Sequence, residues 1–158
     1  MLSLGEIEAL YRAQSPRLRR VAFAILRDEE DAREAVQEAF ARAIRFRSSY
    51  ARGGDVEAWL WRTLVNTCHD VGRRRRLLAD PVAEPWAAES ANGTIGADVR
   101  AVVALLPERQ RLVLFLRHYA DLSYSQIAEV LGIERGTVSA TLHAARASLR
   151  SLLEEVES

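Results

Sequence analysis

The chain has 158 residues, and its 22 basic and 22 acidic side chains give a formal net charge of zero. This length has room for one ordinary domain or two small ones. No apolar run approaches the ~20 residues that cross a bilayer, and no signal peptide pattern opens the sequence, so a soluble, cytoplasmic protein without membrane insertion is expected. A single cysteine excludes an internal disulfide, and the three histidines lack metal-ligand spacing, so neither a metal nor a cofactor is expected.

The zero net charge hides a segregation along the chain. All 22 basic residues are Arg. Residues 1–76 carry 15 Arg against 11 acidic residues, residues 77–97 carry three acidic residues and no Arg, and residues 98–158 carry seven Arg against eight acidic residues. Exclusive use of Arg is typical of a GC-rich genome, which is the preferred explanation. A guanidinium group can also bind phosphate through two hydrogen bonds, so the basic N-terminal half suits a nucleic-acid partner as well.

The first 27 residues are predicted to form two helices. Ser3 and Glu6 match a capping box, which marks a helix start. Pro16 suits the first turn of a helix, so a second helix is expected to begin there and to run to about Arg27.

Two longer helices complete the N-terminal half. Asp28, with Asp31, caps the first, and a loop over residues 46–54 leads to the second, which Asp55 caps and which runs through residue 76. Apolar side chains at helical spacing predict the inward face of the first helix as Ala32, Ala35, Val36, Ala39, Phe40 and Ala43. The inward residues of the second helix are Val56, Leu60, Leu64 and Val71. Trp59 and Trp61 lie two positions apart, so at least one of them is expected to be exposed or at an interface.

Residues 77–97 are predicted to be a flexible linker, because they contain two prolines and two glycines and no sustained helical period. The chain is therefore expected to be all-α, with two small helical domains. Residues 1–76 would form a three- to four-helix bundle, and residues 98–158 a four-helix domain.

Four shorter helices are predicted in the C-terminal domain. The first spans residues 98–106, and Pro107 takes the first helical position of the second. Ser123 and Gln126 form another capping box, opening a third helix that ends before Gly132. The second helix is expected to bury Leu112, Phe115, Leu116 and Tyr119. The last helix is expected to bury Val138, Leu142, Ala145, Leu149 and Leu152.

Residues 123–142 carry a helix-turn-helix pattern. Small Ala128 lets two helices approach, Gly132 suits the left-handed turn, and Ile133 with Val138 fills the angle between the helices. In such a motif the second helix presents its N-terminal residues to the major groove of DNA. An ordinary helical hairpin is the alternative.

Other features are ambiguous when they are considered alone. The arginines at residues 73–76 suit phosphate binding but are also typical of a solvated helix end. Tyr50 could stack on an unpaired base, although an anchor that packs the loop onto the domain is the preferred interpretation. An acidic and amide set opposite the apolar stripe is typical of a solvated face: Asp31, Glu34, Gln37 and Glu38. No partnered nucleophile or phosphate-binding loop stands out, so an enzyme is not expected.

Three segments resemble the sigma-70 family of bacterial transcription initiation factors, in particular its extracytoplasmic-function (ECF) group. Residues 31–44 (DAREAVQEAFARAI) resemble the polymerase-binding helix of region 2, and residues 58–76 (AWLWRTLVNTCHDVGRRRR) resemble the helix that opens and recognises the minus-10 element. Residues 106–150 resemble region 4, which binds the minus-35 element. The resemblance implies a protein that binds core RNA polymerase and directs promoter recognition, minus-10 melting and transcription initiation without catalysing a reaction itself.

The resemblance also implies binding residues. In the family, region 2 docks on the clamp helices of the largest polymerase subunit and region 4 meets the flap. The implied core polymerase contacts are Asp31, Glu34, Gln37, Glu38 and Phe40. The implied minus-10 contacts are Tyr50, Arg52, Trp59, Arg62, Asn66, Asp70, Arg73, Arg74 and Arg76, with Tyr50 in the loop that captures a flipped base. The implied minus-35 contacts are Tyr124, Ser125, Arg135, Gly136, Thr137, Ser139, Ala140, His143 and Arg146.

The chain departs from the family pattern in two places. Ser139, Thr141 and Ala144 stand where the family commonly has a Lys and two Arg, which predicts weaker and less salt-dependent minus-35 binding. Arg33 stands where an acidic residue is usual in the polymerase-binding helix.

Two other functions remain open. One is a stand-alone helix-turn-helix regulator that binds duplex DNA as a dimer, and the other is a sigma factor whose region 4 mainly binds a regulator. The family resemblance implies an anti-sigma factor as a partner, and because no autoinhibitory segment precedes Ser3, regulation by such a partner is expected. The protein is accordingly expected to be a monomer or a heterodimer with that factor.

Overall fold

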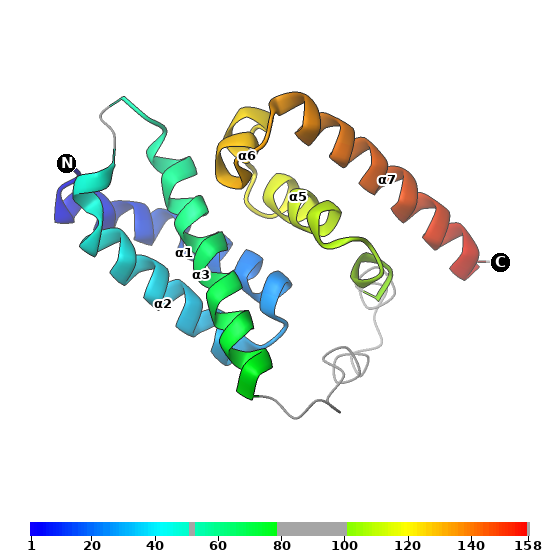
Figure 1. Ribbon diagram of the computed structural model, residues 1–158, viewed down its shortest axis with the longest axis horizontal. Helices are drawn as coiled ribbons and strands as arrows, with labels where there is room; N and C mark the ends of the chain where they lie inside the picture. The colour runs from blue at the N-terminus through cyan, green and yellow to red at the C-terminus, as the bar shows by residue number, and fades with distance from the viewer. Residues whose placement is uncertain (51–52, 79–100, 158) are drawn as a thin grey trace.

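The computed structural model describes residues 1–50, 53–78 and 101–157, and within these ranges every regular element is helical. Figure 1 shows the described helices in two groups, α1 to α3 and α5 to α7. The helices are α1 (Leu4–Leu26), α2 (Glu29–Arg45), the short 3-10 helix η1 (Arg47–Ser49), α3 (Val56–Leu78), α5 (Glu108–His118), α6 (Tyr124–Leu131) and α7 (Arg135–Glu157). Residues 101–104 are also helical. None of the described helices is long and apolar enough to cross a membrane.

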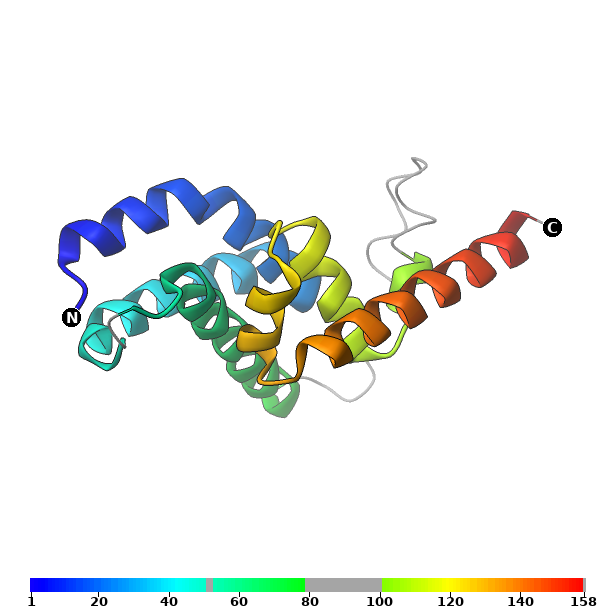
Figure 2. The same ribbon diagram turned by 90° about the horizontal axis from the view of Figure 1, so that it is seen from above.

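A single helix, α1, replaces the two helices expected before Arg27. The Ser3–Glu6 capping box is formed as predicted, with the Glu6 N–H 3.1 Å from Ser3 Oγ. The prediction of a new helix at Pro16 is wrong, because Pro16 lies inside α1, which Figure 2 shows as one curved helix. A proline costs a helix one backbone hydrogen bond, and buried side chains on both sides of Pro16, among them Ile7 and Leu18, offset that loss through packing.

The core of the first group lies between α1, α2 and α3. The alanine-rich stripe of α2 is buried as predicted, while Phe40 is half-buried with its ring centroid 4.4 Å from that of Tyr11. Asp28 and Asp55 cap α2 and α3 through their side chains. Leu60, Leu64 and Val71 are buried as predicted, but Val56 in the first turn of α3 is only half-buried.

Two predictions about α3, the burial of its two tryptophans and the residue at which it ends, can be compared with the structure. Trp61 is fully buried, whereas Trp59 is only half-buried and packs its ring against Tyr50, so the two tryptophans do not share one face but neither is fully exposed. Helix α3 continues to Leu78, so Leu77 and Leu78, assigned to the linker, are helical and exposed. The rest of the predicted linker lies outside the described residues, and the division into two domains stays a prediction.

The second group differs from expectation around α5. Pro107 is the N-cap of α5 rather than its first helical residue. Tyr119 was expected to be buried but is 38% exposed, because the helix ends there and its ring stacks on Phe115 at the surface, with centroids 5.7 Å apart. Phe115 itself is half-buried, and α5 instead buries Val113 and Leu114 in addition to Leu112 and Leu116.

The helix-turn-helix is formed as predicted by α6 and the start of α7. The Ser123–Gln126 capping box opens α6, and Gly132 ends it in the left-handed region with φ 65°. The Ile133 N–H donates to the Ala128 carbonyl at 3.1 Å and closes the turn. Val138, Leu142 and Ala145 are buried, whereas Leu149 and Leu152 are half-buried, because α7 extends beyond the other helices of its group (Figure 1).

The two groups of helices contact each other through α6 and α3. The Arg62 guanidinium on α3 donates to the Glu129 carbonyl on α6, with Nη2 2.8 Å and Nε 3.2 Å from the oxygen. The Gln126 amide donates to Asp55 at 3.1 Å and to Glu57 at 3.3 Å. Helix α6 therefore covers part of the N-terminal half of α3.

Candidate polymerase and promoter interfaces

A network of ion pairs joins the polar face of α2 to the C-terminal half of α3. Arg42 lies 2.9 Å from Glu38 on its own helix and 2.8 Å from Asp70 on α3. Arg74 on α3 lies 2.8 Å from Glu38 and 3.9 Å from Glu34. Residues assigned to polymerase binding and residues assigned to DNA binding are therefore partners of each other.

A second part of this network is less accessible. Arg75 Nε lies 2.9 Å from Asp31, and Arg75 Nη2 lies 3.3 Å from Asp28. The side chain of Asp31 is only 10% exposed, so it does not lie on a solvated face. Burial raises the pKa of Asp31, and the positive charge of Arg75 opposes that rise. Asp31 thus joins α2 to the end of α3, a role that the sequence pattern did not indicate.

The carboxylate of Glu38 is held in its charged form. Partial burial acts to raise its pKa, but hydrogen bonds from Arg42 and Arg74 outweigh burial and leave the pKa below its ordinary value. The pKa of Arg42 is raised, first by its hydrogen bond to Asp70 and also by Glu38. Arg42 was not among the predicted residues, although its position four residues after Glu38 is a recognisable helical pairing.

The five predicted polymerase contacts do not all lie on one open face. Glu34 and Gln37 are exposed, and Glu38 is half-buried against α3. Phe40 packs on Tyr11 of α1, and Asp31 is buried. Glu34, Gln37 and the exposed edge of Glu38 are the parts of this set that a partner could reach without rearrangement.

Tyr50 is an anchor in this structure. Its hydroxyl donates to the Gly54 carbonyl, and its ring meets Trp59 edge to face, with centroids 5.9 Å apart. A base could stack on the Tyr50 ring only after these contacts open. Arg52, in the same loop, lies outside the described residues.

The remaining minus-10 candidates follow one side of α3. Arg62, Asn66, Arg73, Arg74 and Arg76 are exposed. Asp70 lies between them, bound to Arg42 and 3.9 Å from Arg73. Figure 1 shows α6 lying beside this helix, and the contact of Arg62 with the α6 backbone occupies its guanidinium.

The minus-35 candidates are brought together at the open end of the helix-turn-helix. Eight of the nine are exposed: Ser125, Arg135, Gly136, Thr137, Ser139, Ala140, His143 and Arg146. The ninth, Tyr124, is half-buried beneath the guanidinium of Arg117, which lies 5.3 Å from its ring centroid. Only Arg135 and Arg146 in this set carry a permanent positive charge.

Two further side chains of α5, Arg117 and His118, lie beside this surface but are not among the implied minus-35 contacts. Arg117 donates to the Leu122 carbonyl at 2.9 Å and so ties α5 to the start of α6. Partial burial lowers the pKa of His118, and the charges of Arg146 and Arg117 lower it further. His118 therefore lies within electrostatic reach of Arg117 on its own helix and of Arg146 on α7, because α5 and α7 pack against each other.

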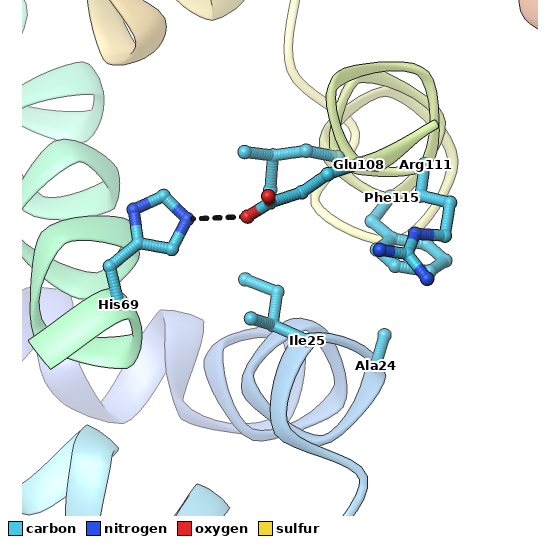
Figure 3. A pocket seen from close by; sticks show the side chains of 7 residues that line it. Ala24, Ile25, His69, Glu108, Arg111 and Phe115 are labelled. Carbon is cyan, nitrogen blue, oxygen red and sulfur yellow. Dashed lines mark ion pairs between the residues drawn. The ribbon is translucent and has the colours of Figure 1, made fainter. Parts of the chain in front are cut away.

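Two of the hollows among the described residues can be compared with ordinary ligand sites. One, of about 60 Å³, lies between α1, α3 and α5 (Figure 3), where His69 Nε2 is 3.6 Å from Glu108 Oε1. It is far smaller than the ~300–1,000 Å³ of ordinary ligand pockets. The other, of about 640 Å³, is an open groove between α1 and α2 that Phe23 and Arg33 help to line. Neither lining contains a Ser, Thr, Cys or Lys nucleophile, and no cluster of metal-ligating side chains occurs in the described ranges.

Comparisons with known proteins cover both halves of the chain. Residues 10–77 match the model of sigma-70 region 2, and residues 97–149 match that of sigma-70 region 4. ECF RNA polymerase sigma factor SigE of Mycolicibacterium smegmatis is 32% identical over 157 residues, which cover 92% of this chain and 61% of the relative. The RNA polymerase sigma-E factor of Streptomyces antibioticus is 32% identical over 156 residues, covering 94% of this chain and 85% of the relative.

Solved structures share the fold. Sigma factor RpoE in complex with anti-sigma factor NepR from Bartonella quintana superposes with a TM-score of 0.75 at 23% identity, covering 96% of this chain and 98% of that one. CnrH in complex with the cytosolic domain of CnrY gives a TM-score of 0.76 at 24% identity, covering 97% and 90%. With both regions matched in order, the chain belongs to the sigma-70 family, within the ECF group of RNA polymerase sigma factors.

Proposed function

We propose that this sigma factor binds core RNA polymerase through the exposed part of α2 and directs it to promoters through α3 and the helix-turn-helix. It acts in the cytoplasm, where the polymerase is, and catalyses no reaction itself. The observation that carries the proposal is the placement of the exposed polar edge of α2 directly beside the arginine run at the end of α3. That placement supports simultaneous contact with a protein surface and a DNA strand.

A reconstitution experiment tests this function. Purified protein is mixed with core polymerase, and run-off transcription is measured on genomic fragments after co-elution on a sizing column. We expect co-elution and new start sites. Replacement of Gln37 and Glu34 by Ala should reduce co-elution, whereas Tyr50→Ala should preserve it and impair minus-10 melting, measured by permanganate reactivity of unpaired thymines. Absence of co-elution by the wild-type protein would contradict the proposal.

The same experiment distinguishes a stand-alone regulator. Such a protein would bind specific duplex sites without polymerase, and an electrophoretic shift with the free protein would reveal it. A sigma factor should show almost no specific binding until core polymerase is added.

Region 4 has a second candidate function, as a regulator-binding module. The observation that favours it is the neutral recognition surface, where Ser139, Ala140 and Thr137 are exposed and only Arg135 and Arg146 are cationic. The test compares holoenzyme binding to promoters with intact and scrambled minus-35 elements at two salt concentrations. Equal affinity for both promoters would favour the module, because base contacts create sequence preference.

We also propose an anti-sigma factor as a regulator of this protein. The similar fold of RpoE, solved with the anti-sigma factor NepR, supports this proposal. Co-purification from the native host followed by mass spectrometry tests it, and recovery only with polymerase subunits would argue against it.

A further inference from the structure

The arginine run at the end of α3 is largely neutralised by acidic residues in this structure. Arg74 pairs with Glu38 and Glu34, and Arg75 pairs with Asp31 and Asp28. Arg73 lies 3.9 Å from Asp70. Arg76 forms no ion pair with any residue that the structure describes. In this arrangement only part of the run is available to phosphate.

The pairs of Arg74 and Arg75 differ in accessibility. The Asp31 carboxylate that holds Arg75 is 10% exposed, so this pair belongs to the packed junction of α2 and α3. Arg74 is 54% exposed and its partner Glu38 is 30% exposed, so both can exchange partners at the surface. Arg42, which binds Glu38 and Asp70 together, keeps the Glu38 carboxylate in place.

Arg74 and Glu38 could therefore each bind a partner outside this chain. Arg74 lies in the run assigned to the promoter strand, and Glu38 lies on the edge of α2 assigned to polymerase. Exposed ion pairs are weak, so either partner can be displaced at small cost.

We propose that Glu38 and Arg74 form an exchangeable ion pair that couples polymerase docking to promoter-strand binding. In the free protein Glu38 holds Arg74 away from DNA. A polymerase cation that engages Glu38 releases Arg74 to a phosphate of the promoter strand. This inference rests on the proposed function, and thermodynamic linkage requires that DNA bound to Arg74 strengthens polymerase binding by the same factor.

The first test uses the free, full-length protein and a fluorescein-labelled oligothymidylate, with binding followed by fluorescence anisotropy over a range of salt concentrations. Glu38→Gln should bind about two- to fivefold more tightly than wild type, the range expected for one exposed ion pair. The slope of log affinity against log salt should steepen by about 0.7, the value for one more phosphate contact on a single strand.

The matched control is Glu29→Gln. Glu29 lies on the same helix, next to Asp28, which Arg75 contacts, and it forms no ion pair within the described part of the chain. Because this variant removes the same charge without freeing an arginine, its salt slope should equal that of wild type. A gain in the control equal to the gain in Glu38→Gln would overturn the proposal, as would a failure of Glu38→Gln to bind at low salt.

A double variant isolates the pair. Glu38→Gln combined with Arg74→Gln should bind the oligonucleotide no better than Arg74→Gln alone, and a retained gain would overturn the proposal. Arg74→Gln should also bind core polymerase about two- to fivefold more tightly in the absence of DNA, because its Glu38 keeps only Arg42 as a partner and exposes the carboxylate oxygen that Arg74 held. This measurement does not depend on whether Glu38→Gln folds, and the folding of that variant is checked by thermal unfolding followed by circular dichroism. An unchanged affinity of Arg74→Gln for polymerase would overturn the coupling. Failure of wild type to bind polymerase would instead defeat the proposed function.

Discussion

At the scale of single residues, neighbours decide what each charged side chain can do. Asp31 and Glu38 lie on the same helix and belong to one sequence pattern, yet Asp31 is buried against Arg75 while Glu38 remains at the surface. The spacing of acidic residues on α2 indicates a shared face, but only the position of the α3 arginines separates a structural carboxylate from an exchangeable one.

Replacement of Asp31 tests its structural role. Asp31→Ala removes the side chain that joins α2 to α3 at a nearly buried site, and we expect it to lower the free energy of unfolding by about 1–3 kcal/mol through lost packing and the lost hydrogen bond to Arg75. Urea denaturation measures the change. Glu34→Ala is the control, since Glu34 is exposed and lies 3.9 Å from Arg74, and it should alter stability by less than about 0.5 kcal/mol. Equal effects of the two variants would show that burial of Asp31 is unimportant.

The lowered pKa of Glu38 predicts a dependence of stability on pH. A carboxyl group whose pKa is lower in the folded state stabilises that state above its unfolded pKa, near the ordinary value of 4.5. The stabilisation is lost as pH falls through the folded pKa. The difference in unfolding free energy between wild type and Glu38→Gln should therefore be largest near neutral pH and shrink in acid, as measured by urea denaturation across pH. A difference that grows in acid would contradict the assignment.

At the scale of elements, sequence signals predicted helix ends correctly where one capping residue or one glycine determines the backbone conformation. The capping boxes at Ser3 and Ser123 are formed, and Gly132 ends α6. Such signals failed where packing competes with propensity. Pro16 lies inside α1 because the helix is buried on both sides of it, and Tyr119 is exposed because α5 ends there. The spacing of apolar residues identifies which face of a helix is buried, but it does not identify the residue at which the helix ends.

The glycine at the turn of the helix-turn-helix provides an element-scale prediction. Gly132 has φ 65°, and no atom lies within 4 Å of the position that an added methyl group would take, so Gly132→Ala should cost about 1–2 kcal/mol through backbone conformation alone. Gly136 also has open space but lies in α7, so Gly136→Ala should stabilise the protein by about 0.5–1 kcal/mol. Thermal unfolding compares the two variants. A stabilised Gly132→Ala would show that the turn does not need its left-handed residue.

At the scale of the whole molecule, the two groups of helices are in contact. Helix α6 lies on α3 (Figures 1 and 2). The Arg62 guanidinium that is assigned to the minus-10 strand donates to the Glu129 carbonyl of α6. A contact of Arg62 Nε and Nη2 with a DNA phosphate therefore requires that these two donors leave the α6 carbonyl. Free protein and promoter-bound protein are expected to differ in the relative placement of their two groups.

Energy transfer between two dyes tests this rearrangement. Ala9 on α1 and Ala147 on α7 are exposed, so Ala9→Cys and Ala147→Cys provide labelling sites. The native Cys68 is buried, and burial raises the pKa of its thiol to about 12, so it should not be labelled in the folded protein. Transfer should be efficient in the free protein and fall when core polymerase and promoter DNA are added. Unchanged efficiency would mean that the two groups move as one body.

The sequence by itself determined the helical class, the family, the helix-turn-helix and part of the core of each group, such as the alanine stripe of α2. These depend on periodicity, capping residues and glycine at a turn, which act within a few neighbouring positions. Tertiary structure alone decided that Asp31 is buried, that Arg74 and Arg75 are held by acidic residues of α2 and its N-cap, and that Arg62 donates to the α6 backbone. Those properties depend on which helices meet, because the charge available to a partner is what remains after the chain has paired its own side chains.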